Sequence, residues 1–190
     1  MDDEYVIVPL PDGVIRKGFS CGIRLIDNFV KNNAAKQHKK GQVRVHAAVH
    51  VASNRLIGFV SLCLKTYEPD LSEESKELFE RVQAVPTVYI AMIGVTEEFQ
   101  KKGIGGDLLW YAFEKSVEIA NIAGTYALTL NANDDSLCEY YQNLDFIRMS
   151  EDDETRIMYI PISKIREAIA QAGSEQPSTA NSEVANSTVA

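Results

Sequence analysis

Residues 100–105, with the sequence QKKGIG, separate an apolar run from an amphipathic one and constrain the fold more than any other part of the chain. Residues 88–95 before them are β-branched and apolar, which is typical of a buried strand. Residues 106–120 after them carry apolar side chains at helical spacing. A glycine-opened helix leaves backbone N–H groups unpaired at its start, where its dipole favours negative charge. The sequence therefore predicts a phosphate-binding turn, followed by a helix whose buried residues are Leu108, Leu109, Ala112, Phe113, Val117 and Ala120.

The spacing excludes the common nucleotide-binding loops. A Walker loop needs Gly-Lys followed by Ser or Thr at its end, and no such run occurs. A dinucleotide fingerprint needs a third glycine three residues after the second, where this chain has Leu108. The turn instead resembles the pyrophosphate-binding signature of the GNAT superfamily of N-acetyltransferases: Gln or Arg, two residues, Gly, one residue, Gly or Ala. The element order is similar to the family from about residue 18 to about residue 162.

The resemblance implies an α/β (α+β) fold, the GNAT acyl-CoA N-acyltransferase fold. Its central sheet is mixed, mostly antiparallel and six- to seven-stranded, with helices on both faces and a splayed central strand pair. The implied co-substrate is acetyl-CoA. The Ile93 N–H is expected to hold the thioester oxygen, and Gly94 to mark a local bulge, although an incidental glycine in a buried strand is the alternative. The residues expected to bind acetyl-CoA are Ile93, Gly94, Val95, Gln100, Lys101, Lys102, Gly103, Ile104, Gly105, Gly106 and Asn131.

A second family motif is a helical tyrosine separated by three residues from Gly-Phe. Tyr141 and Phe146 match it, whereas Asp145 replaces the glycine and is expected to tolerate left-handed geometry. Direct attack of an amine on the thioester in a ternary complex needs a proton for the departing thiolate. A phenol with a pKa of about 10 suits a thiol with a pKa of about 8.5. The resemblance thus implies Tyr141 as general acid, and a packing aromatic is the alternative.

The sequence does not identify a general base. Residues 88–95 contain no Asp or Glu, although many family members carry a base there. His46 and His50 are alternatives, but a structural role suits them equally. Glu97 and Glu98 fit a solvated loop. A base is unnecessary if the acceptor is an α-amine with a pKa of about 8.

Length and composition predict one domain, residues 1–172, and a disordered tail, residues 173–190, which lacks aromatic residues. The first residues lack a basic region, and no run of about 18 apolar residues occurs, so we expect a cytoplasmic protein without membrane contact. Cys21, Cys63 and Cys138 show no metal or disulfide spacing and are expected to be reduced thiols, and no metal site is expected.

The remaining patterns predict local elements. Residues 20–41 resemble a helix with Ser20 as N-cap, Gly41 as its stop and a buried stripe of Ile23, Ile26, Phe29, Val30 and Ala34. Other ranges predict a strand at 5–10, a hairpin at 43–51 and 56–65, a helix at 72–82 within an acidic insertion, a strand at 126–133, a helix at 134–146, a closing strand pair at 146–150 and 155–162, and a terminal helix at 162–173.

The resemblance implies that the acceptor is a primary amine, on a small molecule, a peptide or an aminoacyl-tRNA. Residues 18–37, the acidic insertion and the C-terminal MYIPISKI resemble the GNAT-type toxins of bacterial toxin–antitoxin pairs, which implies aminoacyl-tRNA, an antitoxin partner and a homodimer. The chain has a net charge of −8, yet its N-terminal third is basic, with Asp27 the one acid among Arg16, Lys17, Arg24, Lys31, Lys36, Lys39, Lys40 and Arg44. A non-catalytic acyl-CoA-binding sensor or partner module is a third hypothesis.

Overall fold

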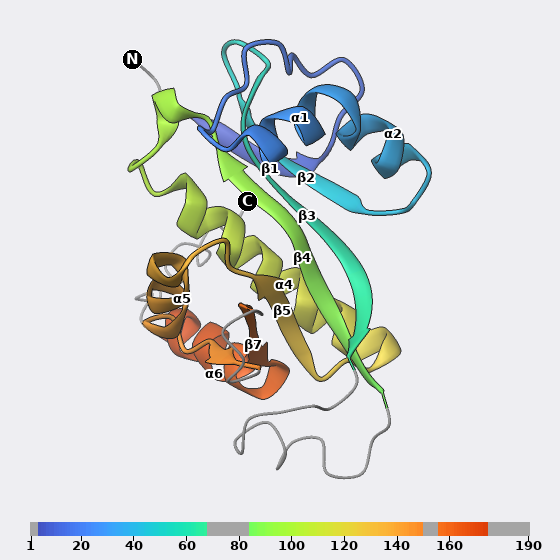
Figure 1. Cartoon of the computed structure of the whole chain (residues 1–190), viewed down its shortest axis with the longest axis vertical. Coiled ribbons are helices and arrows are strands. Elements are labelled where there is room, and N and C mark those ends of the chain that lie inside the picture. Colours follow the sequence, from blue (N-terminus) through green and yellow to red (C-terminus); the bar gives the residue numbers. More distant parts are fainter. Residues whose placement is uncertain (1–3, 68–83, 150–155, 175–190) are drawn as a thin grey trace, which may run out of the picture.

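The computed structural model describes residues 4–67, 84–149 and 156–174. Within them, seven strands form one sheet in the order β1-β2-β3-β4-β5-β7-β6 (Figure 1). Every neighbouring pair is antiparallel except β4 and β5, which are parallel, so the predicted mixed sheet is confirmed. The strands are β1 (Tyr5–Pro9), β2 (Arg44–His50), β3 (Arg55–Tyr67), β4 (Val85–Val95), β5 (Ala127–Asn131), β6 (Ile147–Arg148) and β7 (Ile157–Pro161).

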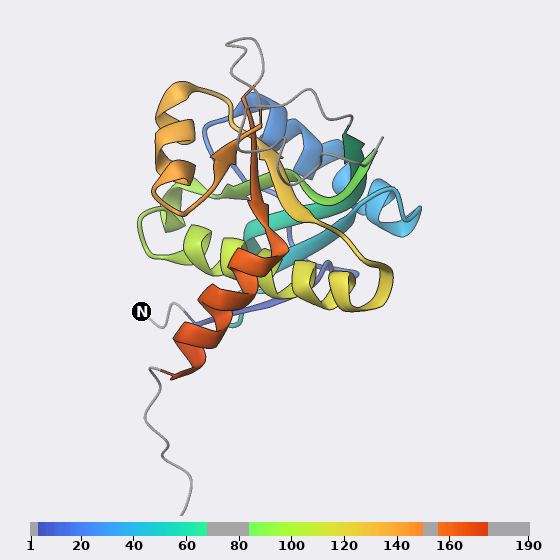
Figure 2. The same ribbon diagram turned by 90° about the horizontal axis from the view of Figure 1, so that it is seen from below.

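Helices cover both faces of the sheet, as predicted. α1 (Arg24–Asn32) and α2 (Ala34–Lys39) lie on one face, whereas α4 (Ile104–Ala123) and α6 (Ile162–Ser174) lie together on the other (Figure 2). The period-two alternation of β3 explains the two cores, since Phe59 packs with α1 and the next residue, Val60, packs with α4. The shorter elements are η1 (Glu97–Phe99) and α5 (Asp135–Gln142).

The two central strands separate along their length. Residues 87–90 of β4 pair with residues 127–130 of β5, and β4 then continues to Val95 with no further β5 partner. After β5, the N–H of Ala132 donates instead to the carbonyl of Arg156, beyond which β7 begins. Figure 1 shows β5 turning away from β4 at this end. The predicted splayed central pair is therefore confirmed.

The helix after the glycine-rich turn begins at Ile104, two residues before the predicted amphipathic stretch. Gly103 is its N-cap, with a φ of 87°, in the left-handed region that favours glycine. Within the predicted stripe, Val117 and Ala120 are only partly buried, because they lie at the margin of the core. The fully buried members of the stripe are Leu108, Leu109, Ala112 and Phe113.

The predicted N-terminal helix differs from the structure in three ways. Ser20 does not cap it, because Gly22 adopts a φ of 86° and the helix begins only at Arg24. The Asp27 carboxylate instead accepts a hydrogen bond of 2.8 Å from the Cys21 N–H. The helix also breaks at Asn33 into α1 and α2. Ile23, predicted to be buried, is 40% exposed because it precedes the first turn.

The C-terminal elements follow the prediction closely. β6 and β7 pair antiparallel, and α6 runs to Ser174, two residues past the predicted domain end. Asp145 has a φ of 63°, the left-handed geometry expected of it. The predicted helix at 72–82 and residues 175–190 of the predicted tail lie outside the described residues. Over the ranges that are described, no helix combines the length and hydrophobicity needed to cross a bilayer.

Candidate active site

A cleft of about 280 Å³ opens where β4 and β5 separate. Six of the predicted site residues line it, namely Ile93, Gly94, Val95, Gly105, Asn131 and Tyr141. The other lining residues were not among the predicted site residues, and they come from five elements and the segments beside them. They are Ile23, Leu25, Ile26, Ile90, Ala91, Met92, Leu109, Leu130, Ala132, Asn133, Leu137 and Tyr140. None of these described lining residues carries a charge.

The glycine-rich turn forms one end of the cleft. The first hydrogen bond from within α4 is donated by Asp107 to the Gly103 carbonyl, at 3.1 Å, so the N–H groups of Ile104, Gly105 and Gly106 have no acceptor within the helix. A side chain at Gly105 would find only Val95, at 3.9 Å, which leaves the backbone open to a ligand. This arrangement suits a diphosphate.

The side chains of the predicted turn residues do not line the cleft. Ile104 is 2% exposed, so only its backbone can reach a ligand. The Lys102 ammonium lies 4.7 Å from the centre of the Phe99 ring. Lys101 has a φ of 60°, which helps to turn the chain into the helix. Lys101, Lys102, Gly103, Ile104 and Gly106 thus shape the end of the cleft without lining it.

Gln100 has its side chain engaged inside the protein. Its Nε2 donates to the carbonyl of Cys21 at 3.1 Å and to that of Val95 at 3.0 Å. An amide nitrogen carries two hydrogens, so both are used. Gln100 therefore joins the turn to the segment before α1, a contact between residues far apart in sequence that motif spacing does not reveal.

The predicted bulge at Gly94 is wrong. Gly94 pairs regularly with Phe59, whereas the register shifts between Met92 and Ile90, which leaves Ala91 as the extra residue. Gly94 is needed for packing instead, since an added Cβ would lie 3.1 Å from Ile26 Cγ2 and 3.5 Å from Cys21 Sγ. The glycine lets α1 approach β4.

Replacing Gly94 by valine should destabilise the fold by about 1–3 kcal/mol, the usual cost of overpacking a core. The clash with Ile26 explains the sign. Denaturant unfolding would measure it. Gly106→Ala is the matched control, because a Cβ there has no atom within 4 Å and helix propensity favours alanine. Equal stability of the two variants would contradict the packing role of Gly94.

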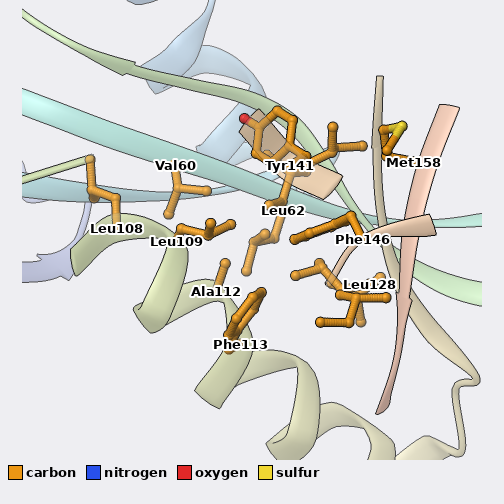
Figure 3. Packing of buried hydrophobic residues seen from close by; sticks show 14 of the residues in the cluster. Val60, Leu62, Leu108, Leu109, Ala112, Phe113, Leu128, Tyr141, Phe146 and Met158 are labelled. Atoms are coloured by element: carbon orange, nitrogen blue, oxygen red, sulfur yellow. The ribbon is translucent and has the colours of Figure 1, made fainter. Parts of the chain in front are cut away.

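Tyr141 lies on α5 with its ring in the core and its hydroxyl away from it. The residue is 8% exposed, and its ring centroid lies 5.3 Å from that of Phe146. Figure 3 shows the hydroxyl oxygen pointing away from Phe146 and Phe113, and Tyr141 lines the cleft. Burial, with a smaller contribution from Tyr140, raises the pKa of Tyr141 to about 12. The phenol is therefore protonated at neutral pH, as a proton donor must be.

His46 and His50 do not line this cleft. His46 Nδ1 lies 3.0 Å from the Tyr111 hydroxyl, and His50 Nδ1 lies 2.8 Å from the Ser53 hydroxyl. Burial, reinforced by Lys115, lowers the pKa of His46 to about 4. The structure thus supports the structural alternative for both histidines.

The lowered pKa of His46 predicts a pH dependence of stability. Below its usual pKa of 6.5 the unfolded chain gains a proton that the folded protein binds only near pH 4, so stability should fall as the pH drops from 6.5 to 4. His46→Gln should flatten this part of the stability curve, measured by denaturant unfolding at several pH values. Tyr111→Phe keeps the histidine and should retain the slope. An unchanged slope in His46→Gln would contradict the assignment.

Other reactive groups take no part in the cleft. Glu98 pairs with Arg55 at 3.1 Å, and Glu97 is exposed, as expected of a solvated loop. Burial raises the pKa of the Cys21 thiol to about 11, which makes it a poor nucleophile. The three cysteines are free. In the described ranges no three His, Cys, Asp or Glu side chains gather in a way that could hold a metal ion.

Comparison with known proteins agrees with this geometry. The Acetyltransferase (GNAT) family profile matches residues 24–146. The chain is 31% identical over 128 residues to the probable toxin TacT of Sinorhizobium fredii (strain NBRC 101917 / NGR234), covering 66% of this chain and 71% of that protein. It is 24% identical over 142 residues to a tRNA-acetylating toxin of Mycobacterium tuberculosis (strain ATCC 25618 / H37Rv), covering 75% and 83% of the two chains.

Solved structures share the fold. AtaT complexed with acetyl-methionyl-tRNAfMet gives a TM-score of 0.79 at 19% identity, covering 87% of this chain and 99% of that one. A tyrosine-to-phenylalanine mutant of AtaT, bound to acetyl-CoA and the C-terminus of the antitoxin AtaR, gives 0.76 at 18% identity, covering 90% and 100%. The family profile matches more than half of the 190 residues. The chain therefore belongs to the GNAT family of acetyl-CoA-dependent acetyltransferases.

Proposed function

We propose that the protein acetylates the α-amino group of an aminoacyl-tRNA by direct attack on acetyl-CoA in a ternary complex. The observation that carries this proposal is the cleft lining, in which no described residue is charged. The described lining residues include no Asp, Glu or His that would deprotonate an ammonium ion. The proposal therefore has the acceptor amine arrive neutral.

This requirement separates the classes of amine. At pH 7.5 an α-amine with a pKa of about 7.8 is about one-third neutral, whereas a lysine amine with a pKa of about 10.4 is neutral in about one molecule in a thousand. Peptide lysines and polyamines are thus disfavoured by a factor of several hundred before any contact is made. The lining alone favours an α-amine.

The basic surface supports RNA as the carrier of that amine. Arg16 donates a hydrogen bond of 3.2 Å to the Val30 carbonyl, and the other seven basic residues between positions 16 and 44 are exposed. They are Lys17, Arg24, Lys31, Lys36, Lys39, Lys40 and Arg44. Local basic patches bind phosphate whatever the net charge of the chain. The relatives named as tRNA-acetylating and as bound to acetylated tRNA support the same substrate.

Three groups of the chain would carry the reaction. The unpaired N–H groups of Ile104, Gly105 and Gly106 would hold the diphosphate. Beyond Ile90, β4 has no partner on its β5 side, so backbone N–H groups there face the cleft, and we assign that of Ile93 to the thioester oxygen. Tyr141 would protonate the leaving thiolate. Burial raises the pKa of a thiol as it does that of a phenol, which keeps the two groups comparable.

The test is acetyl transfer by the purified protein. Acetyl-CoA is supplied with aminoacyl-tRNA, uncharged tRNA, a lysine peptide or a polyamine, and acetylated product and free CoA are measured. Turnover with aminoacyl-tRNA, at a rate that falls steeply with salt, is expected. Turnover with the lysine peptide alone would contradict the proposal. Binding of acetyl-CoA without turnover on any acceptor would instead favour the sensor hypothesis.

The toxin relatives also suggest protein partners. One AtaT structure contains the C-terminus of the antitoxin AtaR. By analogy we propose an antitoxin for this chain, and the homodimer implied by the resemblance stays a prediction. Co-purification with the product of an adjacent gene, and the mass of the isolated protein in solution, would test these two points separately.

A further inference from the structure

Three large exposed apolar side chains line the cleft. Leu25 is 68% exposed, Tyr140 is 47% exposed and Ile23 is 40% exposed, and all three line the cleft. Leaving such side chains in water is unfavourable, and their convergence around a cavity marks a surface for an apolar ligand. Their position shows whether they would contact acetyl-CoA or the acceptor.

The start of α1, with Ile23 and Leu25, lies on the face of the sheet opposite α4. Met92 and Gly94 face the α1 side of β4, whereas Ile93 and Val95 pack toward α4. The cleft therefore passes between the strands from one face to the other. Acetyl-CoA bound at the start of α4 would occupy the part of the cleft on the α4 face of the sheet. The part on the α1 face, next to Leu25, would remain for the acceptor.

Hydrogen bonds hold the segment before α1 to the glycine-rich turn and the residues just before it. Gln100 donates to the Cys21 carbonyl at 3.1 Å. The Glu97 N–H donates to the Ser20 carbonyl at 2.8 Å, and the Thr96 hydroxyl donates to the same carbonyl at 3.1 Å. These bonds end two to three residues before Ile23. The start of α1 and the diphosphate turn thus form one connected unit.

Close packing leaves that unit little freedom to shift. An added Cβ at Gly22 would lie 3.3 Å from Glu97 Oε1, and one at Gly94 would lie 3.1 Å from Ile26 Cγ2. The Asp27 carboxylate also accepts the Cys21 N–H at 2.8 Å. The position of residues 23–26, called here the α1 corner, therefore depends on Gln100 and its neighbours.

We propose that the α1 corner selects the acceptor by its side chain, favouring large apolar amino acids, and that Gln100 is the positioning residue that fixes this corner. The proposal rests on the function proposed above and names the substrate class within it. It gives Leu25 a direct contact with the acceptor. It predicts that replacing Gln100 changes the KM for the acceptor. If Gln100 were instead a ligand of the diphosphate, its replacement would change the affinity for acetyl-CoA.

The contact is tested by charging one tRNA body with leucine, glycine or aspartate. The wild-type protein should show the highest kcat/KM for the leucyl form and the lowest for the aspartyl form. Leu25→Ala should lower kcat/KM for the leucyl form about tenfold and leave the glycyl form unchanged, a typical loss for apolar groups in a pocket. Leu64→Ala is the matched control, because Leu64 is 66% exposed but lies outside the cleft.

The positioning role is tested with Gln100→Ala and Gln100→Arg. Gln100→Ala should raise KM for the acceptor about tenfold, as expected when a connected pair of hydrogen bonds is lost, with the Kd for acetyl-CoA within about twofold of wild type by calorimetry. Gln100→Arg should restore the acceptor KM, because a guanidinium supplies several N–H donors. A weakened Kd for acetyl-CoA with an unchanged acceptor KM would instead make Gln100 a diphosphate ligand and overturn its positioning role.

A parallel panel of leucine, glycine and aspartate methyl esters separates the two proposals. If the esters react and no charged tRNA does, the tRNA assignment fails, while the preference for leucine still supports the α1 corner. Equal reactivity of the leucyl and glycyl acceptors, or identical effects of Leu25→Ala and Leu64→Ala, would overturn the inference. Absence of turnover with every acceptor would overturn both.

Discussion

Tyr141→Phe should lower kcat by about 10²–10⁴, the range over which a positioned general acid contributes to a rate. The variant keeps the ring that packs on Phe146, so the fold and the affinity for acetyl-CoA should change little. Under the proposed role of Tyr141, only the proton for the departing thiolate would be lost. Stopped-flow or steady-state release of CoA, with calorimetry for acetyl-CoA binding, would separate the two quantities.

Tyr140→Phe is the control for this experiment. Tyr140 is the neighbouring residue on α5 and also lines the cleft, but the residue is 47% exposed and its ring is tilted by 70° to that of Tyr141. It should retain kcat within a few-fold, on the order of an ordinary contact change. If Tyr141→Phe keeps full turnover, Tyr141 is a packing residue and the acid is elsewhere.

Gly105→Glu should weaken acetyl-CoA binding by at least about 100-fold, because placing like charges together at an interface costs several kcal/mol. Gly105 lies in the first turn of α4 and lines the cleft. The new carboxylate would occupy the position proposed for the diphosphate. Calorimetry with acetyl-CoA and with CoA gives the affinity directly.

Gly105→Ala provides the matched control at the same position. Its methyl group would meet only Val95 at 3.9 Å, an ordinary contact, so the fold should tolerate it and the affinity should fall far less. The effect of Gly105→Glu should shrink in high salt, since part of it is charge repulsion. Equal affinities of the two variants for acetyl-CoA would show that the glycine-rich turn does not bind it.

The fold was predictable wherever one local pattern decided the structure. The apolar run of β4 and the helical spacing of α4 are contiguous signals, and both elements formed as expected. The N-terminal helix was predicted less well, because the left-handed turn at Gly22 and the break at Asn33 override an otherwise helical pattern. Periodicity measures which face is apolar and does not register such backbone changes.

The parts of the site that belong to short sequence motifs were predictable, and the parts that depend on long-range contacts were not. The turn and Tyr141 belong to short motifs, so their positions at the cleft followed from sequence. The contacts of Gln100 and the exposed rim at Leu25 depend on residues about 80 positions apart meeting in space. Gly94 is a further example. A side chain is excluded there because Ile26, which belongs to another element, packs against it. A single sequence contains no direct signal of such encounters.

The single parallel pair of the sheet has a consequence for how the enzyme can diversify. A parallel connection requires a crossover, and here α4 is that crossover, so its first turn is delivered to the end of β4 by chain connectivity alone. The residues proposed to bind acetyl-CoA thus lie mostly in one contiguous block of β4 and α4. The residues proposed to select the acceptor lie in a separate stretch near residue 25, so substitutions there should change the acceptor while the proposed chemistry is kept.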